Sequence, residues 1–129
     1  MYMDEALFHR NEGRLPQATA GIEKSVAVIK KLVAARPNVK SYRFDLAEKY
    51  IHLGTFLIDQ NEIESARDVT ADAVAILEPL VFSDENAFAV CNLGQAYAQL
   101  GQVTLTLGDL AAAMEWTDKD VQLMDAVPP

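Results

Sequence analysis

Residues 46–77 read LAEKYIHLGTFLIDQNEIESARDVTADAVAIL, and residues 93–124 read LGQAYAQLGQVTLTLGDLAAAMEWTDKDVQLM. The two stretches align without a gap at an offset of 47 residues. The identical pairs are Leu46/Leu93, Tyr50/Tyr97, Leu53/Leu100, Gly54/Gly101, Ala66/Ala113, Thr70/Thr117 and Val74/Val121. Self-similarity at a fixed period of this size is typical of stacked supersecondary units. The repeat therefore predicts a fold built by stacking one unit on the next.

The unit itself is helical. Apolar residues recur at spacings of three and four, which predicts amphipathic helices. No stretch shows the alternation of period two that strands require. The expected helices cover about 2–11, 16–35, 41–59, 61–79, 83–107 and 109–127. The sequence thus predicts an all-α chain of six helices, arranged as three antiparallel pairs.

Several residues predict where these helices begin and end. Pro37 and Pro79 are expected to end two of them, because proline cannot continue a helix without losing a hydrogen bond. Asn61, with Glu64 three residues later, has the pattern of a capping box that opens a helix. Ser83 is expected to cap the next one.

Length and charge limit the classes of function. The 129 residues suffice for one domain, 1–129. The net charge is −8, which argues against nucleic acid as a partner. Residues 1–49 hold nine Lys/Arg and six Asp/Glu, a net of +3, whereas residues 50–129 hold two and thirteen, a net of −11. This polarity could align copies end to end, but a solvated surface explains it more simply.

The chain also lacks the signs of membrane or secretory sequences. The longest nearly uncharged run, 87–108, is interrupted by amides, so no membrane span is expected. The N-terminus does not resemble a secretory signal. The single cysteine, Cys91, cannot form an internal disulfide, which fits a cytoplasmic protein.

The residues of the repeat resemble those of tetratricopeptide (TPR) hairpins. The third unit reads Asn92-Leu93-Gly94, then Tyr97, then Leu100-Gly101, and the second reads Asp45-Leu46-Ala47, Tyr50 and Leu53-Gly54. Ala66 and Ala113 stand where the second helix of a TPR hairpin carries alanine. The period of 47 exceeds the usual TPR length. The sequence is similar to the longer TPR-like arrays of large bacterial signalling proteins.

This resemblance implies a short right-handed superhelix of three repeats, at about 1–37, 38–82 and 83–129. Some seven extra residues follow Gly54 and Gly101 in each unit. Seven residues make two helical turns, so the first helix of each hairpin can lengthen without rotating its apolar face.

The resemblance also implies a groove lined by the first helices, which binds a peptide or protein. The expected groove residues are Phe44, Glu48, Ile51, His52, Phe88, Asn92, Gln95 and Gln99. The positions that match a TPR carboxylate clamp include Asp45, Glu48 and Gln95, with Asn92 the only fit, so such a clamp is not expected and a neutral or basic partner is favoured. The alternative is that both phenylalanines pack between repeats and the amides are ordinary solvated side chains.

The last helix raises the question of self-association. The final unit of a repeat array needs a polar cap. Trp116, Leu123 and Met124 lie beside the inner apolar stripe of this helix, so we expect them to pair with a second copy. The alternatives are that the array is truncated or that Trp116 lies flat on its own hairpin.

The sequence shows no catalytic constellation. His9, His52 and Cys91 do not share a metal-ligand spacing, and Cys91 has no histidine within one helical turn. We therefore expect no enzymatic activity, metal or cofactor. The first expectation is a protein-interaction scaffold. The alternatives are an oligomerisation module that pairs through its terminal helices, or a regulatory segment of a larger bacterial signalling protein.

Overall fold

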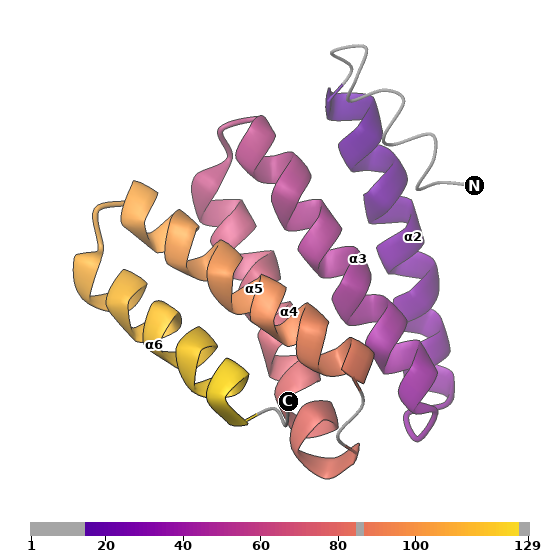
Figure 1. The fold of residues 1–129 in the computed structure, drawn as a ribbon. Coiled ribbons are helices and arrows are strands. Elements are labelled where there is room, and N and C mark those ends of the chain that lie inside the picture. The colour runs from indigo at the N-terminus through magenta and orange to yellow at the C-terminus, as the bar shows by residue number, and fades with distance from the viewer. Residues whose placement is uncertain (1–14, 85–86, 127–129) are drawn as a thin grey trace.

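The secondary structure of the described residues is all α-helix, with short turns between the helices. The computed structural model describes the backbone of residues 15–84 and 87–126, and the side chains of residues 17–81 and 89–125. Within these ranges it contains no strand. The helices are α2 (Leu15–Ala35), α3 (Lys40–Asp59), α4 (Ile63–Asp84), α5 (Ala87–Thr106) and α6 (Leu110–Ala126) (Figure 1). The helix expected at 2–11 lies outside the described residues.

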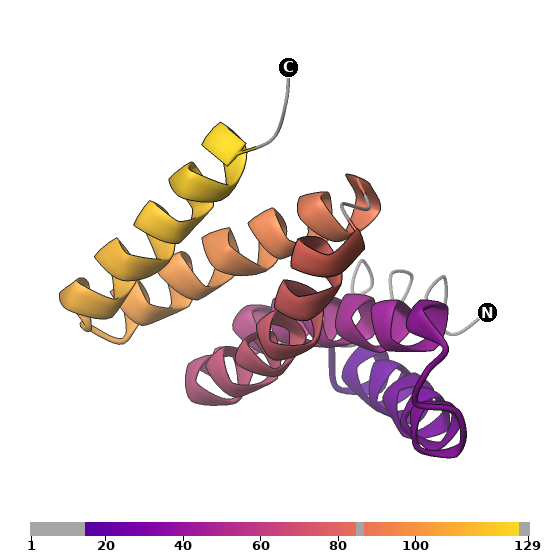
Figure 2. The same cartoon turned by 90° about the horizontal axis from the view of Figure 1, so that it is seen from below.

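The helices pack in chain order. α3 and α4 form one antiparallel hairpin, α5 and α6 form the next, and α2 packs on α3 (Figure 1). α4 also packs on α5, and α3 touches α5 directly. Seen from below, the helices fan out and do not lie in one flat layer (Figure 2). Each hairpin therefore buries its apolar residues partly against the next unit, as stacked repeats do.

One continuous core runs through these contacts. The tyrosines of the two repeats are both buried, Tyr50 at 7% exposure and Tyr97 at 4%. The largest fully buried side chains include Ile22 of α2, Leu77 of α4 and Leu93 of α5, so every described interface contributes to the core.

The first helices of the two hairpins end in the same way. In α3 the amide of Glu62 donates to the Leu57 carbonyl, and the residue before it, Asn61, has a φ of 63°. In α5 the amide of Asp109 donates to the Thr104 carbonyl after Gly108, whose φ is 84°. These are Schellman ends with a left-handed residue, which asparagine and glycine tolerate best. The prediction that Asn61 opens α4 is wrong: it closes α3.

Pro79 does not end α4 as the sequence predicts. It lies inside the helix, which continues to Asp84. Leu80 and Val81, which follow the proline, are 5% and 6% exposed. Their burial compensates for the one backbone hydrogen bond that proline cannot make. Ser83 is consequently part of α4 and does not cap the following helix.

The extra residues of each repeat lengthen the first helix. α3 and α5 are both 20 residues long, and their last residues, Asp59 and Thr106, are one repeat period apart. The helices run past Gly54 and Gly101 without a break. α3 and α5 touch each other directly, and this contact positions the candidate site.

Candidate protein-interaction face

α3 and α5 present neighbouring surfaces on one side of the molecule, with α4 behind them (Figure 1). Phe44, Glu48 and His52 are half-buried on α3, one helical turn apart. On α5, Asn92 is half-buried and Gln95 is exposed. We call these five residues the α3–α5 face. The predicted groove residues therefore include five that reach the surface of these two helices.

Two other predicted groove residues are in the core. Ile51 is 1% exposed and Gln99 is 9% exposed, so neither is available to a partner. The prediction that these two residues line a binding groove is therefore wrong. The physical reason is the direct contact between α3 and α5, which covers the sides of the two helices that face each other. Phe88 lies in α5 but outside the residues whose side chains are described.

Gln99 instead forms a polar joint between three helices. Its Nε2 donates to the Thr70 hydroxyl of α4 at 2.8 Å and to the Ile51 carbonyl of α3 at 3.2 Å. Its Oε1 accepts from Thr55 of α3 at 3.0 Å. Buried amides need such partners, because an unpaired polar group in the interior is costly. Thr55 was not among the predicted site residues, and helical periodicity alone does not reveal its partner.

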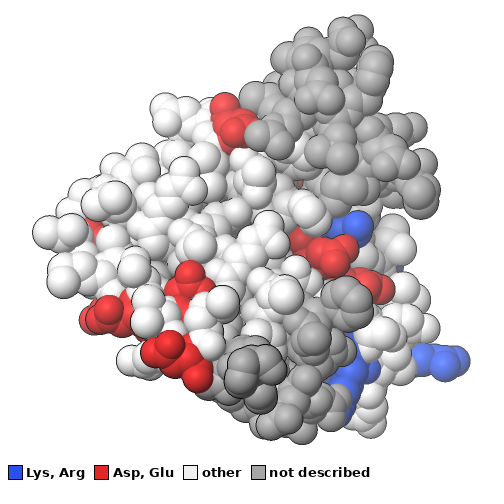
Figure 3. Space-filling view, viewed as in Figure 1, with Lys and Arg blue, Asp and Glu red and all other residues white. Residues whose placement is uncertain are grey.

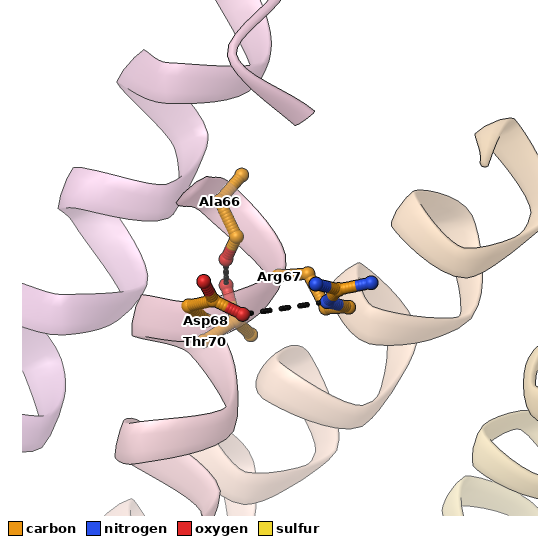
Figure 4. Close-up of polar contacts among 4 residues, drawn as sticks. All are labelled: Ala66, Arg67, Asp68 and Thr70. Carbon is orange, nitrogen blue, oxygen red and sulfur yellow. Dashed lines mark hydrogen bonds and ion pairs between the residues drawn. The ribbon is translucent and has the colours of Figure 1, made fainter. Parts of the chain in front are cut away.

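The Thr70 side of this joint is held by its own helix. The Thr70 hydroxyl donates to the Ala66 carbonyl at 2.7 Å, while the neighbouring Arg67 and Asp68 pair with each other at the exposed surface (Figure 4). Gly54 leaves the space that the joint needs. A Cβ at this position would lie 2.5 Å from the Thr70 hydroxyl and would also meet the Gln99 amide.

We expect Gln99→Leu to destabilise the chain. The substitution keeps the volume of the side chain but leaves the Thr55 hydroxyl and the Ile51 carbonyl without this amide, at a cost of roughly 1–3 kcal/mol. The measurement is urea unfolding followed by circular dichroism. Gln95→Leu, one turn earlier on the exposed surface, is the control and should change stability by less than about 0.5 kcal/mol. Equal effects would show that the joint contributes nothing.

α3 and α5 differ in charge, because α5 has no charged residue whereas α3 carries both acidic and basic ones. In the view of Figure 3 the side formed by these two helices is mostly uncharged, with acidic side chains over α3 and α6 and basic ones toward α2.

Glu48 stands one turn from His52 on α3. Burial lowers the pKa of His52, and Glu48 raises it by a smaller amount. His52 is thus held in its neutral form more strongly than in the unfolded chain.

This lowered pKa predicts a dependence of stability on pH. Below pH 6.5, the ordinary value for histidine, the unfolded chain binds a proton at His52 more readily than the native chain does. The free energy of unfolding should therefore decrease as the pH is lowered from 7 to 5. For the His52→Gln variant this decrease should be less steep. For the Glu48→Gln variant the free energy of unfolding should decrease more steeply, because Glu48 favours the protonated histidine. Parallel urea series for the three proteins measure this, and identical slopes would contradict it.

The residues expected to mediate self-association are mostly turned inward. Trp116 stacks on Tyr97 of its own hairpin, with the ring centroids 5.8 Å apart. Leu123 is 7% exposed and belongs to the core. Of the three, Met124 alone is exposed, at 66%. The alternative that Trp116 lies against its own hairpin is therefore correct.

A polar cluster fixes this arrangement. The Tyr97 hydroxyl donates to Glu78 Oε2 at 2.6 Å, and Lys119 Nζ lies 3.7 Å from the same oxygen. Lys119 also lies 5.0 Å from the centroid of the Trp116 ring, within cation–π range. Burial and the Glu78 carboxylate raise the pKa of Tyr97. The cluster ties α4, α5 and α6 together at their shared edge.

The described residues contain no group of three or more metal-ligating side chains. His9, one of the two histidines, lies outside the described residues. Cys91 is exposed on α5, one turn before Gln95. Among the helices of the described chain, none is long and apolar enough to cross a membrane.

Comparisons with known proteins establish the fold. No family model and no curated protein matches the chain. Among solved structures, the chain is similar to the crystal structure of BtubC (BKLC) from P. vanneervenii, with a TM-score of 0.80 and 17% sequence identity. The match covers 99% of this chain and 48% of that one, so the chain spans about half the length of BtubC. At this identity the likeness is one of fold.

Proposed function

We propose that the chain is a TPR-type protein-interaction scaffold without catalysis of its own, and that it binds a peptide or protein on the α3–α5 face. The observation that supports this most is the contact between α3 and α5, which joins residues of two repeats into one surface. Surfaces shared by successive repeats are what repeat proteins use for binding.

The chemistry of the face suggests the kind of partner. Glu48 is a potential acceptor for a cation, and the amides of Asn92 and Gln95 can pair with a peptide backbone. No basic residue is among the five residues of the face, so an acidic peptide end has no counter-charge there. A neutral or basic segment is the partner that fits.

The test is a selection of short random peptides against the intact chain, followed by affinity measurements. Phe44 is half-buried and packs on the core, so truncating it would confound binding with stability. Glu48→Lys and Gln95→Arg are better variants, since both change the surface. We expect each to weaken the selected peptide about tenfold or more.

The matched control is Asp72→Lys, an exposed position on α4. It should leave the affinity unchanged. If Asp72→Lys weakens binding as much as Glu48→Lys does, or if neither face variant has an effect, the α3–α5 face is not the binding surface.

A further inference from the structure

The outward side of α6 carries a continuous apolar stripe. Its residues are exposed and follow one another at spacings of three and four, which places them on one helix face. We call the set Leu110, Met114, Thr117, Val121 and Met124 the α6 stripe. The exposed fractions of its four apolar members are 54–66%.

The preceding repeat shows what covers such a stripe. One period earlier, the counterparts of Thr117, Val121 and Met124 are Thr70, Val74 and Leu77 of α4. Those three residues are 0%, 4% and 0% exposed. α4 packs against both α3 and α5, and Thr70 bonds Gln99 of α5, whereas α6 packs mainly on α5. The C-terminal part of the stripe, Thr117, Val121 and Met124, therefore repeats a surface that is covered in the preceding repeat, whereas Leu110 and Met114 correspond to the half-buried Ile63 and the exposed Arg67.

The polar half of that interface is repeated as well. In α4 the Thr70 hydroxyl bonds its own helix at Ala66 and accepts the Gln99 amide of α5. In α6 the Thr117 hydroxyl bonds Ala113 at 2.9 Å in the same way. Gly101 lies beside it, as Gly54 lies beside Thr70, with a Cβ position 3.4 Å from the Thr117 hydroxyl. The acceptor is in place for an amide donor.

The charged residues beside the α6 stripe indicate what kind of helix could pack on it. Asp118 and Asp125 lie on one side of the stripe and Asp120 on the other, given the helical spacing. Lys119, the one basic residue of α6, is paired with Glu78. Two copies of the stripe would set carboxylates against carboxylates. A helix with basic flanks is complementary.

We propose that the α6 stripe docks an amphipathic helix of a partner protein. The apolar residues of that helix cover Val121 and Met124, and a glutamine or similar side-chain amide donates to Thr117. Its flanking Lys or Arg residues meet Asp118 and Asp125. This surface is separate from the α3–α5 face, so the two can be tested independently.

The probe is the helix that covers the equivalent surface. A fluorescein-labelled peptide with the sequence of residues 87–106, Cys91→Ser and lysines added at both ends, is titrated with the intact chain, and its anisotropy is recorded. We expect saturable binding that weakens about tenfold or more for Val121→Asp, because that variant places a charge under the helix. Val28→Asp on α2, whose valine is 55% exposed, is the matched control and should bind normally.

The amide contact has its own readout. Gln99→Leu in the peptide should weaken binding to the unchanged chain about two- to tenfold, and should have no such effect on the Thr117→Val chain. No saturable binding, or equal affinity for Val121→Asp, would overturn the proposal. A dimer in sedimentation velocity that Val121→Asp abolishes would make a second copy the occupant, and would overturn it also.

Discussion

Gly54→Ala is expected to lower the free energy of unfolding by roughly 2–4 kcal/mol, even though alanine is normally favoured over glycine in a helix. A Cβ at residue 54 would lie 2.5 Å from the Thr70 hydroxyl, inside the polar joint formed by Gln99. The methyl group must displace buried hydrogen-bonded atoms that belong to α4 and α5. The cost is therefore both steric and polar.

The control is the equivalent glycine of the next repeat. A Cβ at Gly101 would be 3.4 Å from the Thr117 hydroxyl, an ordinary contact, and no helix lies above Thr117 in the described chain. Gly101→Ala should be neutral, or more stable by up to about 1 kcal/mol. Urea unfolding of both variants measures the difference. Similar destabilisation at both positions would mean that the joint is not what requires glycine.

Leu77→Ala is expected to cost roughly 2–5 kcal/mol. Leu77 lies on the buried side of α4 and is 0% exposed, so the substitution leaves a cavity in the core. Thermal and urea unfolding both report the loss. A change below about 1 kcal/mol would show that the interface collapses around the missing side chain.

Met124 lies one repeat period after Leu77, so Met124→Ala is the control for Leu77→Ala. It is 66% exposed, so Met124→Ala should change stability by less than about 0.5 kcal/mol. The two variants remove comparable apolar side chains from equivalent helix positions. A large effect of Met124→Ala would indicate that the α6 stripe is already covered in solution, by a second copy or by other residues of the chain.

The helices are predictable from the sequence because their signals are local. The spacing of apolar residues and the repeat period give both ends of α3 and the end of α5 to within one residue, whereas α5 begins at Ala87 and not near Ser83. The ends of the helices are harder to predict from the sequence. Asn61 has the composition of a helix start, but tertiary context places it in the left-handed conformation that closes α3. Pro79 reads as a helix end, yet burial of Leu80 and Val81 carries α4 beyond it.

The candidate site is less predictable because it depends on which helices touch. Periodicity places Gln99 beside the core stripe of α5, but it does not show that α3 covers this side and supplies the Ile51 carbonyl. Trp116 likewise reads as an exposed aromatic until Tyr97 and Lys119 are found against it. Both misassignments come from contacts between residues far apart in the sequence, which spacing within one helix cannot reveal.

The most direct test of binding at the α3–α5 face uses the single cysteine of the chain. Cys91 is exposed on α5, one turn from Gln95, so a benzophenone maleimide attached there stands beside the face. The matched protein carries Cys91→Ser and Asp72→Cys, with the same label on the outer side of α4. Each is irradiated with the selected peptide bound. The proposed function predicts cross-linked peptide from Cys91 and little from Asp72→Cys, and adducts that form mainly from Asp72→Cys would contradict it.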